Sequence, residues 1–368
     1  MAAGVFTVLF FVRVFYRLFF SLRVLGKRKR EAGNNKTTPV SLLFTIRNEE
    51  ANIRKNLPEI LKIENADFEV VVIDDFSQDN SLSVLGTMKS VEKRIHVSSL
   101  NQETRYSVKL AQNIALKAAQ NDWVMVVPVS VSGFGNEWLL RISERTGQDN
   151  TLILNYTNVS DGKGFYRLLY RVESFIQQFK SVGYCKAGLP FVYSEINVAF
   201  RKEKYFETGG YGQKVKEPYA NLELIINSFI KKKETDITFV AETSVWKDEN
   251  ITRDDYYDLL NKSIRIENYL TFGKRVVLFA DEFSKLLFIP VLLLVIVFLP
   301  ELWLVYTVLS VLLFVLYLLI IKFVLNRLNE RKLFLSSLAY DLLAPYFKGY
   351  YRWHFRKRSG NQKWRSKI

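Results

Sequence analysis

Two short polar stretches follow apolar, β-rich runs, and their residue types could bind a ligand. Asn48-Glu49 follow the run VSLLFTI, and Asp74-Asp75 end the run FEVVVIDD. A third run, WVMVVPV, leads into Pro128–Ser130. In a parallel sheet, ligands bind beyond the carboxyl ends of the strands, so these positions would share one ligand-binding rim. Taken singly, each also fits a structural role, Asp-Asp as a turn and Glu49 as a charge at a helix start.

The elements that would position this rim alternate between strands and helices. Predicted strands cover residues 40–46, 68–75, 94–100 and 123–129. Residues 48–63 and 107–120 have apolar side chains at helical spacing. Asn48 is a candidate cap for the first of these helices, and Ser77 or Asp79 could cap a helix after the second strand. The alternation predicts an α/β fold with a mostly parallel sheet covered on both faces.

Apolar segments near the C-terminal end predict attachment to a membrane. Leu302–Ile321 is a run of 20 residues without a charge, about the length that crosses a bilayer core. Leu286–Leu299 has 14 residues and would cross only within a helix that begins near Phe279. Pro300-Glu301 would form the turn between them. We therefore predict a transmembrane hairpin over residues 279–325, against the alternative of two buried core helices.

The two ends of the chain are less simple. Val5–Leu25 is apolar but contains Arg13, Arg17 and Arg23, and an arginine at the centre of a membrane helix costs about 2.5–3.5 kcal/mol. Residues 1–30 could therefore form a membrane-surface helix or a spanning helix, with a basic flank. Residues 326–368 are predicted to form an amphipathic membrane-surface helix, over Leu333–Trp353, and a basic tail.

The net charge of +15 lies wholly at these ends. Residues 1–30 carry seven basic and no acidic residues, and residues 326–368 carry eleven basic and two acidic ones, which leaves −1 for the middle. Basic residues beside membrane segments predict anionic lipids as partners rather than nucleic acid. The positive-inside rule then places the middle domain in the cytoplasm. One Cys and two His residues exclude an intrachain disulfide and a His-rich metal cluster.

Four segments, in order, resemble family 2 glycosyltransferases. VSLLFTIRNEEANI resembles the opening strand and Asn-Glu turn of that family, and FEVVVIDDFSQDNS its Asp-Asp-x-Ser-x-Asp turn. YSVKLAQNIALKAAQNDWVMVV is similar to the Lys-bearing helix and next strand, and INVAFRKEKYFETGGYG to the Asn-x-Ala-Phe-Arg-Lys…Gly-Gly segment. The resemblance covers about residues 38–270. It implies a Rossmann-like GT-A fold and a protein of the bacterial inner membrane that serves envelope glycan or glycolipid synthesis.

The resemblance also implies roles for single residues. Glu49, Asp74 and Asp75 would hold the uracil and ribose of a nucleotide sugar. Lys109 would lie near the phosphates. Lys262 and Arg265 match the ends of the family's Gln-x-x-Arg motif, which grips the acceptor and diphosphate, although only the Arg is kept.

The family's metal site is where the sequence first departs from the pattern. The family places Asp-x-Asp at the end of the fourth strand, where carboxylates bind the Mg²⁺ or Mn²⁺ that bridges the diphosphate. The matching positions are Pro128, Val129 and Ser130. Pro and Val offer no side-chain ligand, and a neutral Ser hydroxyl is a poor one. We therefore expect no metal cofactor.

The catalytic base is the second departure. The family has an acidic pair at the start of a helix after the Gly-Gly segment, and one member takes the proton of the acceptor hydroxyl. The best register puts Asn221 and Leu222 there. Glu217 or Glu223 could substitute if the loop is shifted. Glu195 replaces an expected Gly and could crowd the acceptor side or act as a relocated base.

These departures from the family pattern affect the expected metal ligands and catalytic base, whereas the predicted strands are retained. Removing a metal that neutralises a leaving diphosphate forfeits several kcal/mol of transition-state stabilisation. We therefore predict a retained fold without metal-dependent transfer, a membrane scaffold that binds a nucleotide sugar, a lipid-linked glycan or an active glycosyltransferase. The alternative is a metal-independent glycosyltransferase, with Lys109, Lys262 or Arg265 on the diphosphate and one of the three glutamates as base.

Overall fold

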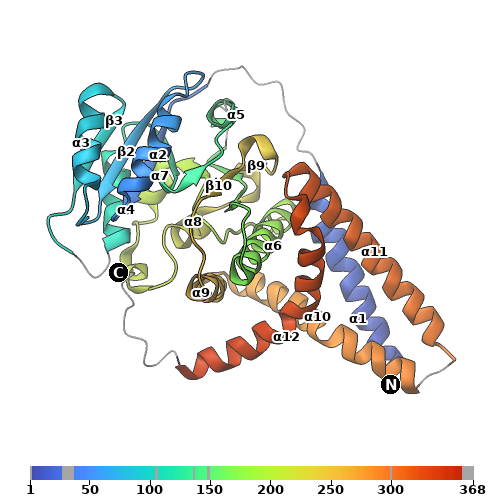
Figure 1. The fold of residues 1–368 in the computed structure, drawn as a ribbon. Helices are drawn as coiled ribbons and strands as arrows, with labels where there is room; N and C mark the ends of the chain where they lie inside the picture. The colour runs from blue at the N-terminus through green and yellow to red at the C-terminus, as the bar shows by residue number, and fades with distance from the viewer. Residues whose placement is uncertain are drawn as a thin grey trace.

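The structure, a computed structural model, describes residues 2–26, 37–103, 107–135, 137–146, 150–298 and 301–358. A seven-stranded sheet of order β3-β2-β1-β4-β8-β6-β9 lies at its centre (Figure 1). The strands are β1 (Val40–Ile46), β2 (Phe68–Asp74), β3 (Ile95–Ser99), β4 (Trp123–Val126), β6 (Leu152–Asn155), β8 (Val198–Arg201) and β9 (Thr235–Thr238). β8 runs antiparallel to β4 and β6, and the other pairings are parallel. This confirms the predicted α/β fold.

Helices cover both faces of the sheet because side chains alternate along each strand. In β1, Val40, Leu42 and Phe44 pack with α2 (Glu50–Leu61), α3 (Ser81–Val91) and α5 (Trp138–Thr146). Leu43 lies on the opposite face, in a core shared with α4 (Ser107–Ala118) and α8 (Glu223–Phe229). The helices predicted over 48–63 and 107–120 are α2 and α4.

The fourth predicted strand is shorter than expected, whereas the first three match to within one residue at each end. β4 ends at Val126, because Pro128 has no backbone N–H with which to continue the ladder. The N–H of Val131 donates to the carbonyl of Pro128 at 3.1 Å, which closes a turn. The chain then enters a small three-stranded sheet made of β5 (Val131–Ser132), β10 (Val245–Lys247) and β7 (Thr157–Val159).

The predicted cap of the first helix, Asn48, was wrong. α2 begins after Glu49, and Asn48 instead adopts φ 54° and accepts a hydrogen bond from the backbone of Gln78 at 2.7 Å. The free N–H groups at the start of α2 donate across the rim, from Glu49 to Ser81 Oγ at 3.0 Å and from Glu50 to Asp79 Oδ2 at 3.1 Å. The start of α2 is therefore capped by side chains at the start of α3 and in the turn before it, not by its own turn.

The second cap differs in the same way. α3 begins after Asn80, whose side chain makes no capping bond. Ser77 lies outside the helix and donates its hydroxyl to Asp74. Asp79 accepts the N–H of Ser81 at 3.0 Å, so one of the two predicted residues does contact the start of α3.

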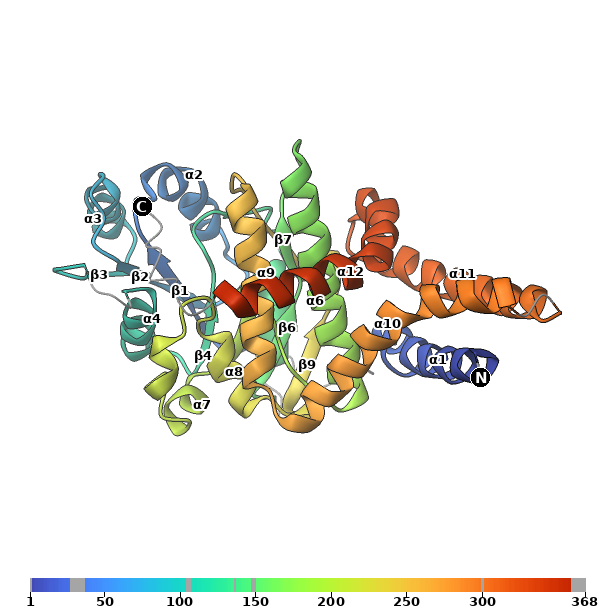
Figure 2. The same ribbon diagram turned by 90° about the horizontal axis from the view of Figure 1, so that it is seen from below.

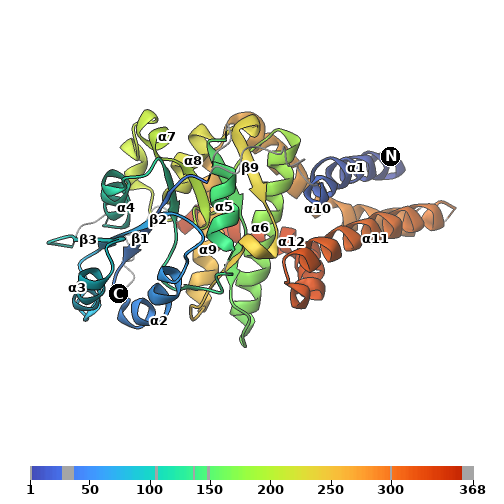
Figure 3. The ribbon, with the colours of Figure 1, turned by 90° about the horizontal axis from the view of Figure 1, so that it is seen from above.

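The remaining helices between the strands and at the end of the domain are α6 (Phe165–Ala187), α7 (Lys202–Glu207) and α9 (Arg253–Tyr269). The helices near the two ends of the chain are α1 (Ala2–Tyr16), α10 (Phe272–Phe298), α11 (Trp303–Arg327) and α12 (Phe334–Arg358). Short helical turns are η1 (Arg17–Ser21), η2 (Leu22–Leu25), η3 (Gly212–Lys216), η4 (Lys232–Glu234), η5 (Ala241–Thr243) and η6 (Arg331–Leu333). Figures 1 and 3 show α1, α10 and α11 side by side, extending away from the sheet.

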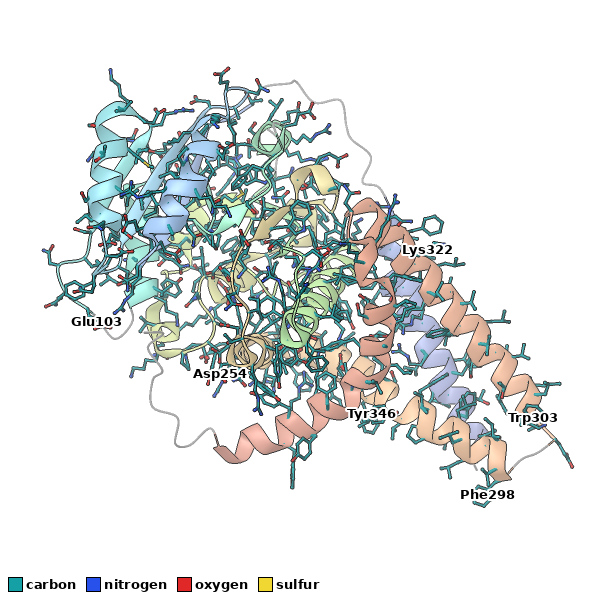
Figure 4. The ribbon with its side chains drawn as sticks, in the orientation of Figure 1. Glu103, Asp254, Phe298, Trp303, Lys322 and Tyr346 are labelled. Carbon is teal, nitrogen blue, oxygen red and sulfur yellow. The ribbon has the colours of Figure 1, made fainter. Side chains whose placement is uncertain are left out.

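Two segments of the described chain, Ala3–Leu25 and Trp303–Arg327, are long and apolar enough to cross a membrane. α10 is not a third, because Asp281, Glu282 and Lys285 fall in the stretch that would cross. Phe298 and Trp303 lie at the outer tip and Lys322 near the domain (Figure 4). α10 and α11 lie side by side as the arms of a helical hairpin, although Pro300 of its turn lies outside the described residues. Of the predicted transmembrane hairpin over residues 279–325, only α11 is among the segments apolar enough to cross, so the crossing of α10 stays a prediction.

The arginines of the N-terminal helix have partners in the rest of the chain. Arg13 donates to Asp281 at 2.7 Å and Arg17 to Asp341 at 3.0 Å. Arg23 donates to the carbonyl of Lys186 at 3.2 Å. Because these groups are paired, the cost expected for an isolated arginine in a membrane helix does not apply in full.

The predicted C-terminal helix is present, but one of its faces is buried against the domain. In α12, Lys348 pairs with Glu173 at 2.6 Å, and Arg352 pairs with Glu267 at 2.7 Å. Figure 2 shows α12 crossing α6 and α9. Exposed apolar side chains remain on α12: Leu335, Leu342, Leu343, Tyr350 and Trp353. The predicted basic flank and basic tail lie mostly outside the described residues.

Candidate nucleotide and transfer site

The carboxyl ends of β1 and β2 meet at one edge, as predicted. Asp74 is in register with Ile46, and the N–H of Asp75 donates to the carbonyl of Ile46 at 2.8 Å. Both aspartates are buried. Asp74 accepts the backbone N–H of Ser77 at 3.2 Å and the hydroxyl of the same residue. Asp74 therefore shapes the turn at the rim.

Glu49 lies at the same rim and is only partly buried. Its Oε2 accepts a hydrogen bond from Asn52 at 2.6 Å. Burial raises the pKa of Glu49, and the nearby carboxylates of Glu249 and Asp79 raise it further. This rim therefore has an acidic side, to which a residue far along the sequence contributes.

That residue, Glu249, reaches the position where the family's metal ligands were expected. Ser130 is buried, and its hydroxyl donates to Glu249 Oε1 at 2.7 Å. The other carboxylate oxygen of Glu249 accepts from Lys247 Nζ at 2.9 Å. Asn56 holds the carbonyl of Val129 at 2.8 Å. Within the described ranges, no group of three or more His, Cys, Asp or Glu side chains could hold a metal ion.

The three predicted base candidates lie in one buried cluster with the two predicted acceptor-side cations. Lys262, from α9, pairs with Glu223 Oε1 at 2.9 Å, and Glu223 is fully buried at the start of α8. Arg265, one turn further along α9, lies 3.9 Å from Glu217 Oε1. Glu195 completes the group. We call Glu195, Glu217, Glu223, Lys262 and Arg265 the glutamate cluster.

Glu195 binds the start of α8. Its Oε2 accepts the N–H of Leu222 at 2.7 Å, and its Oε1 accepts from the amide of Gln112 at 3.0 Å. Burial and the adjacent Glu223 carboxyl raise the pKa of Glu195 to about 8. Burial alone would raise the pKa of Glu223, but the attraction of Lys262 and hydrogen bonds with Glu195, Lys262 and the backbone of Asn221 together lower it. One carboxyl of this pair is therefore ionised at neutral pH while its neighbour retains a proton.

Lys109 is also buried, and its ammonium contacts the loop before α8. It donates to the backbone carbonyls of Lys214 at 3.2 Å, Val215 at 3.3 Å, and Glu217. Burial lowers the pKa of Lys109. These bonds fix the loop that carries Glu217. A role of Lys109 at the phosphates stays a prediction.

Comparison with known proteins bears on the family and the fold. Residues 41–206 match the model of glycosyl transferase family 2. Residues 41–206 are a family 2 glycosyltransferase-like domain. The match spans β1 to α7 and includes the rim aspartates and Glu195. No curated protein sequence matches the chain significantly.

Several solved structures are similar to this chain. The mannosyltransferase PcManGT from Pyrobaculum calidifontis, in complex with GDP-Man and Mn²⁺, has a TM-score of 0.55 at 15% identity and covers 93% of this chain and 97% of that one. TarS 1-349 of S. aureus, in complex with UDP, has a TM-score of 0.44 at 15% identity, with 90% and 94% covered. Mannosyl-3-phosphoglycerate synthase from Rubrobacter xylanophilus has 0.45 at 13%, with 65% and 76% covered. The first of these supports the GT-A fold of the family 2 domain.

Two contributors to the site were missed in the sequence. Gln112 follows Lys109 by three residues in a predicted helix, so its presence on the same face could have been inferred. Glu249 gave no such signal, because it is 119 residues from Ser130 and reaches it through the small sheet. The structure thus places Glu49, Asp74 and Asp75 at one rim, a hydrogen-bonded chain of Ser130, Glu249 and Lys247 where metal ligands were expected, and the Glu223–Lys262 ion pair next to the expected base position. The roles of these residues stay predictions.

Proposed function

We propose that this protein is a membrane-anchored, family 2 glycosyltransferase-like protein that binds a nucleotide sugar and has lost metal-dependent sugar transfer. We further propose that it serves envelope glycan or glycolipid synthesis, with its domain facing the cytoplasm of a bacterial inner membrane. The family match and the GT-A fold support the nucleotide-sugar part. The two apolar segments, Ala3–Leu25 and Trp303–Arg327, support the anchor.

The observation that carries the loss of metal chemistry is the hydrogen-bonded chain from Ser130 through Glu249 to Lys247. Glu249, whose carboxylate reaches the expected metal position, has one oxygen on Ser130 at 2.7 Å and the other on Lys247 at 2.9 Å. A divalent cation would have to displace a neighbouring ammonium to use it. Such a site is far poorer in hard oxygen ligands than Mg²⁺ or Mn²⁺ requires.

The glutamate cluster supports the same conclusion from the acceptor side. Glu223 lies next to the position of the family's base, but its carboxylate is fully buried and paired with Lys262 at 2.9 Å. A base must reach the proton that it removes. A carboxylate without solvent access that is already bound to an ammonium is poorly suited to that task.

Calorimetric titration of the detergent-solubilised full chain with UDP, UDP-sugars and GDP-mannose, with and without Mn²⁺, tests this proposal. We expect a nucleotide to bind with an affinity that Mn²⁺ does not change, and no release of sugar from the donor. Asp75→Asn should weaken this binding, whereas Glu137→Gln, in an exposed pair with Arg141, should not. Binding strengthened by Mn²⁺, or no nucleotide binding at all, would contradict it.

A metal-independent glycosyltransferase is the second candidate, and Glu195 is the observation that favours it. A buried carboxyl with a pKa of about 8 can exchange a proton near neutral pH, and strongly shifted pKa values gather at functional sites. If Glu195 is a base, sugar release without metal should rise with pH through that value and should be abolished in Glu195→Gln. Equal, background release by both proteins would exclude this candidate.

A further inference from the structure

The first half of α10, residues 272–283, carries exposed apolar side chains along one side of the helix. Phe272, Val276, Phe279 and Phe283 are 79%, 47%, 64% and 47% exposed. Residues that follow one another at intervals of three or four lie on one face of a helix. We call these four residues the α10 stripe. Adjoining exposed apolar side chains of this kind mark a surface that contacts a partner or a membrane.

The opposite side of this half of α10 is held by the rest of the chain, so the stripe has a fixed direction. Leu278 and Asp281 are buried. Asp281 pairs with Arg13 of α1 at 2.7 Å, and the hydroxyl of Tyr16 donates to the carbonyl of Val277 at 2.7 Å. A rotation of α10 that covered the stripe would break this buried ion pair, which is costly.

The helices around the stripe are the membrane-associated ones. α10 packs against α1 and α11, and the segments Ala3–Leu25 and Trp303–Arg327 are long and apolar enough to cross a membrane. α12 also contacts α10 and has exposed apolar side chains of its own, such as Tyr350 and Trp353. Figure 1 shows α10 and α12 crossing below the sheet, where the hairpin leaves the domain. The stripe therefore adjoins the candidate spanning segments rather than forming an isolated patch on the domain.

The charges beside the stripe favour a lipid surface as its partner. The two acidic residues of this half of α10 are engaged within the chain, Asp281 with Arg13 and Glu282 with Lys180. Arg275, next to the stripe, is exposed. Phenylalanines on one face with a basic residue at their side are typical of helices that lie at the surface of a membrane.

We propose that the first half of α10 lies on the membrane surface, with the α10 stripe among the lipid head groups and upper acyl chains and Arg275 near the lipid phosphates. This inference rests on the membrane anchor of the proposed function and adds a contact that the spanning segments alone do not require. α10 follows α9 after only Leu270 and Thr271. The contact therefore brings the end of α9, which carries Arg265 of the glutamate cluster, close to the lipid surface.

The test places a nitroxide spin label on single introduced cysteines of the full chain in phospholipid vesicles. Cys185 is buried and should label little. Phe279→Cys reports on the stripe, and Leu312→Cys, at an exposed position of α11, is the reference for lipid. Val91→Cys, at an exposed apolar position of α3 in the domain, is the reference for water. Each label is exposed to oxygen, which concentrates in lipid, and to a nickel chelate, which stays in water.

The ratio of the two collision rates gives the environment of each label. We expect Phe279→Cys to favour oxygen, as Leu312→Cys does, and Val91→Cys to favour the nickel chelate. If Leu312→Cys lies in lipid and Phe279→Cys in water, the inference is overturned and the anchor stands. If Leu312→Cys also lies in water, the anchor itself fails. Shielding of Phe279→Cys from both reagents, with broadening by a second label, would assign the stripe to a second copy of the chain and would overturn the inference too.

Charge placed on the stripe gives an independent test. The double variant Phe279→Asp with Phe283→Asp should move a label in Val276→Cys from lipid to water, because buried carboxylates without partners are costly among acyl chains. Val91→Asp introduces the same charge at an exposed apolar position of the domain and should leave the label in Val276→Cys in lipid. An unchanged ratio of collision rates in the double variant would contradict the contact of the stripe with lipid.

Discussion

At the level of single residues, the ion pair of Glu223 and Lys262 can be tested by its effect on stability. Glu223 has no solvent exposure, so loss of its partner would leave a carboxylate buried without a counter-charge. We expect Lys262→Met to destabilise the protein by about 3–5 kcal/mol, measured by urea unfolding in detergent. Lys231→Met, which breaks an exposed pair with Glu234, is the control and should cost less than about 1 kcal/mol.

The double variant Lys262→Met with Glu223→Leu refines that prediction. Because both charges are then removed, it should be more stable than Lys262→Met alone. If Lys262→Met loses no more stability than the exposed control Lys231→Met, the ion pair of Glu223 and Lys262 does not contribute the stability argued for it.

The pH dependence of stability provides a second test at this scale, through Glu195. Its folded pKa of about 8 lies above the ordinary 4.5 of a glutamate, so between these values the folded protein keeps a proton that the unfolded chain releases. Raising the pH from 5 to 8 should therefore lower the free energy of unfolding. Glu195→Gln cannot titrate and should flatten this slope, whereas Glu59→Gln, on the exposed face of α2, should leave it unchanged. If the free energy of unfolding fell more steeply with pH in Glu195→Gln than in the parent protein, the raised pKa of Glu195 would be contradicted.

The residue types at 128–130 showed that the rim lacks the family's metal ligands, but not which side chains reach that position instead. Pro128, Val129 and Ser130 could be judged as metal ligands from their chemistry alone. The carboxylate of Glu249 and the ammonium of Lys262 reach the site only through long-range packing of β10 and α9. No local pattern encodes such contacts, so the candidate residues could be named in advance but not their partners.

At the level of elements, the packing of the N-terminal helix depends on one glycine. Gly183 in α6 lies against η1, and a Cβ there would be 2.6 Å from the carbonyl oxygen of Phe20, too close for either backbone to accept. We expect Gly183→Ala to lower the free energy of unfolding by about 1–3 kcal/mol. Gly86→Ala, in α3 with nothing within 4 Å, should instead raise it by about 0.5–1 kcal/mol through helix propensity. If both variants change the free energy of unfolding in the same direction, α6 and η1 do not approach each other as closely as the structure shows.

The elements themselves were largely predictable, because strand periodicity and the long apolar run are local signals. β1 matches its predicted bounds, and α11 begins one residue after the predicted segment. The caps at Asn48 and Ser77 were wrong because the donors at the start of α2 bond to a neighbouring turn. Arg13 and Arg17 were hard to interpret for the same reason, since their partners Asp281 and Asp341 lie hundreds of residues away.

At the scale of the whole molecule, the hairpin should place its tip across the membrane from the domain. Glu103 lies at the far side of the domain and Trp303 near the hairpin tip (Figure 4). In intact cells, a membrane-impermeant thiol reagent should label Glu301→Cys but not Glu103→Cys, and permeabilised cells should allow both. Cys185 is buried and should contribute little background. Labelling of both positions from one side would mean that the hairpin does not cross.

The central claim is that the rim where a metal would bridge a diphosphate has no cation site, and binding of Mn²⁺ tests it most directly. Electron paramagnetic resonance of Mn²⁺ mixed with the full chain and UDP reports the free ion. Because UDP itself binds Mn²⁺, the reference is the same mixture without protein, and we predict that equimolar protein, parent or Glu249→Gln, lowers the free-ion signal no further. Stoichiometric loss of that signal in the parent protein, restored by Glu249→Gln, would contradict the account and mark Glu249 as a metal ligand.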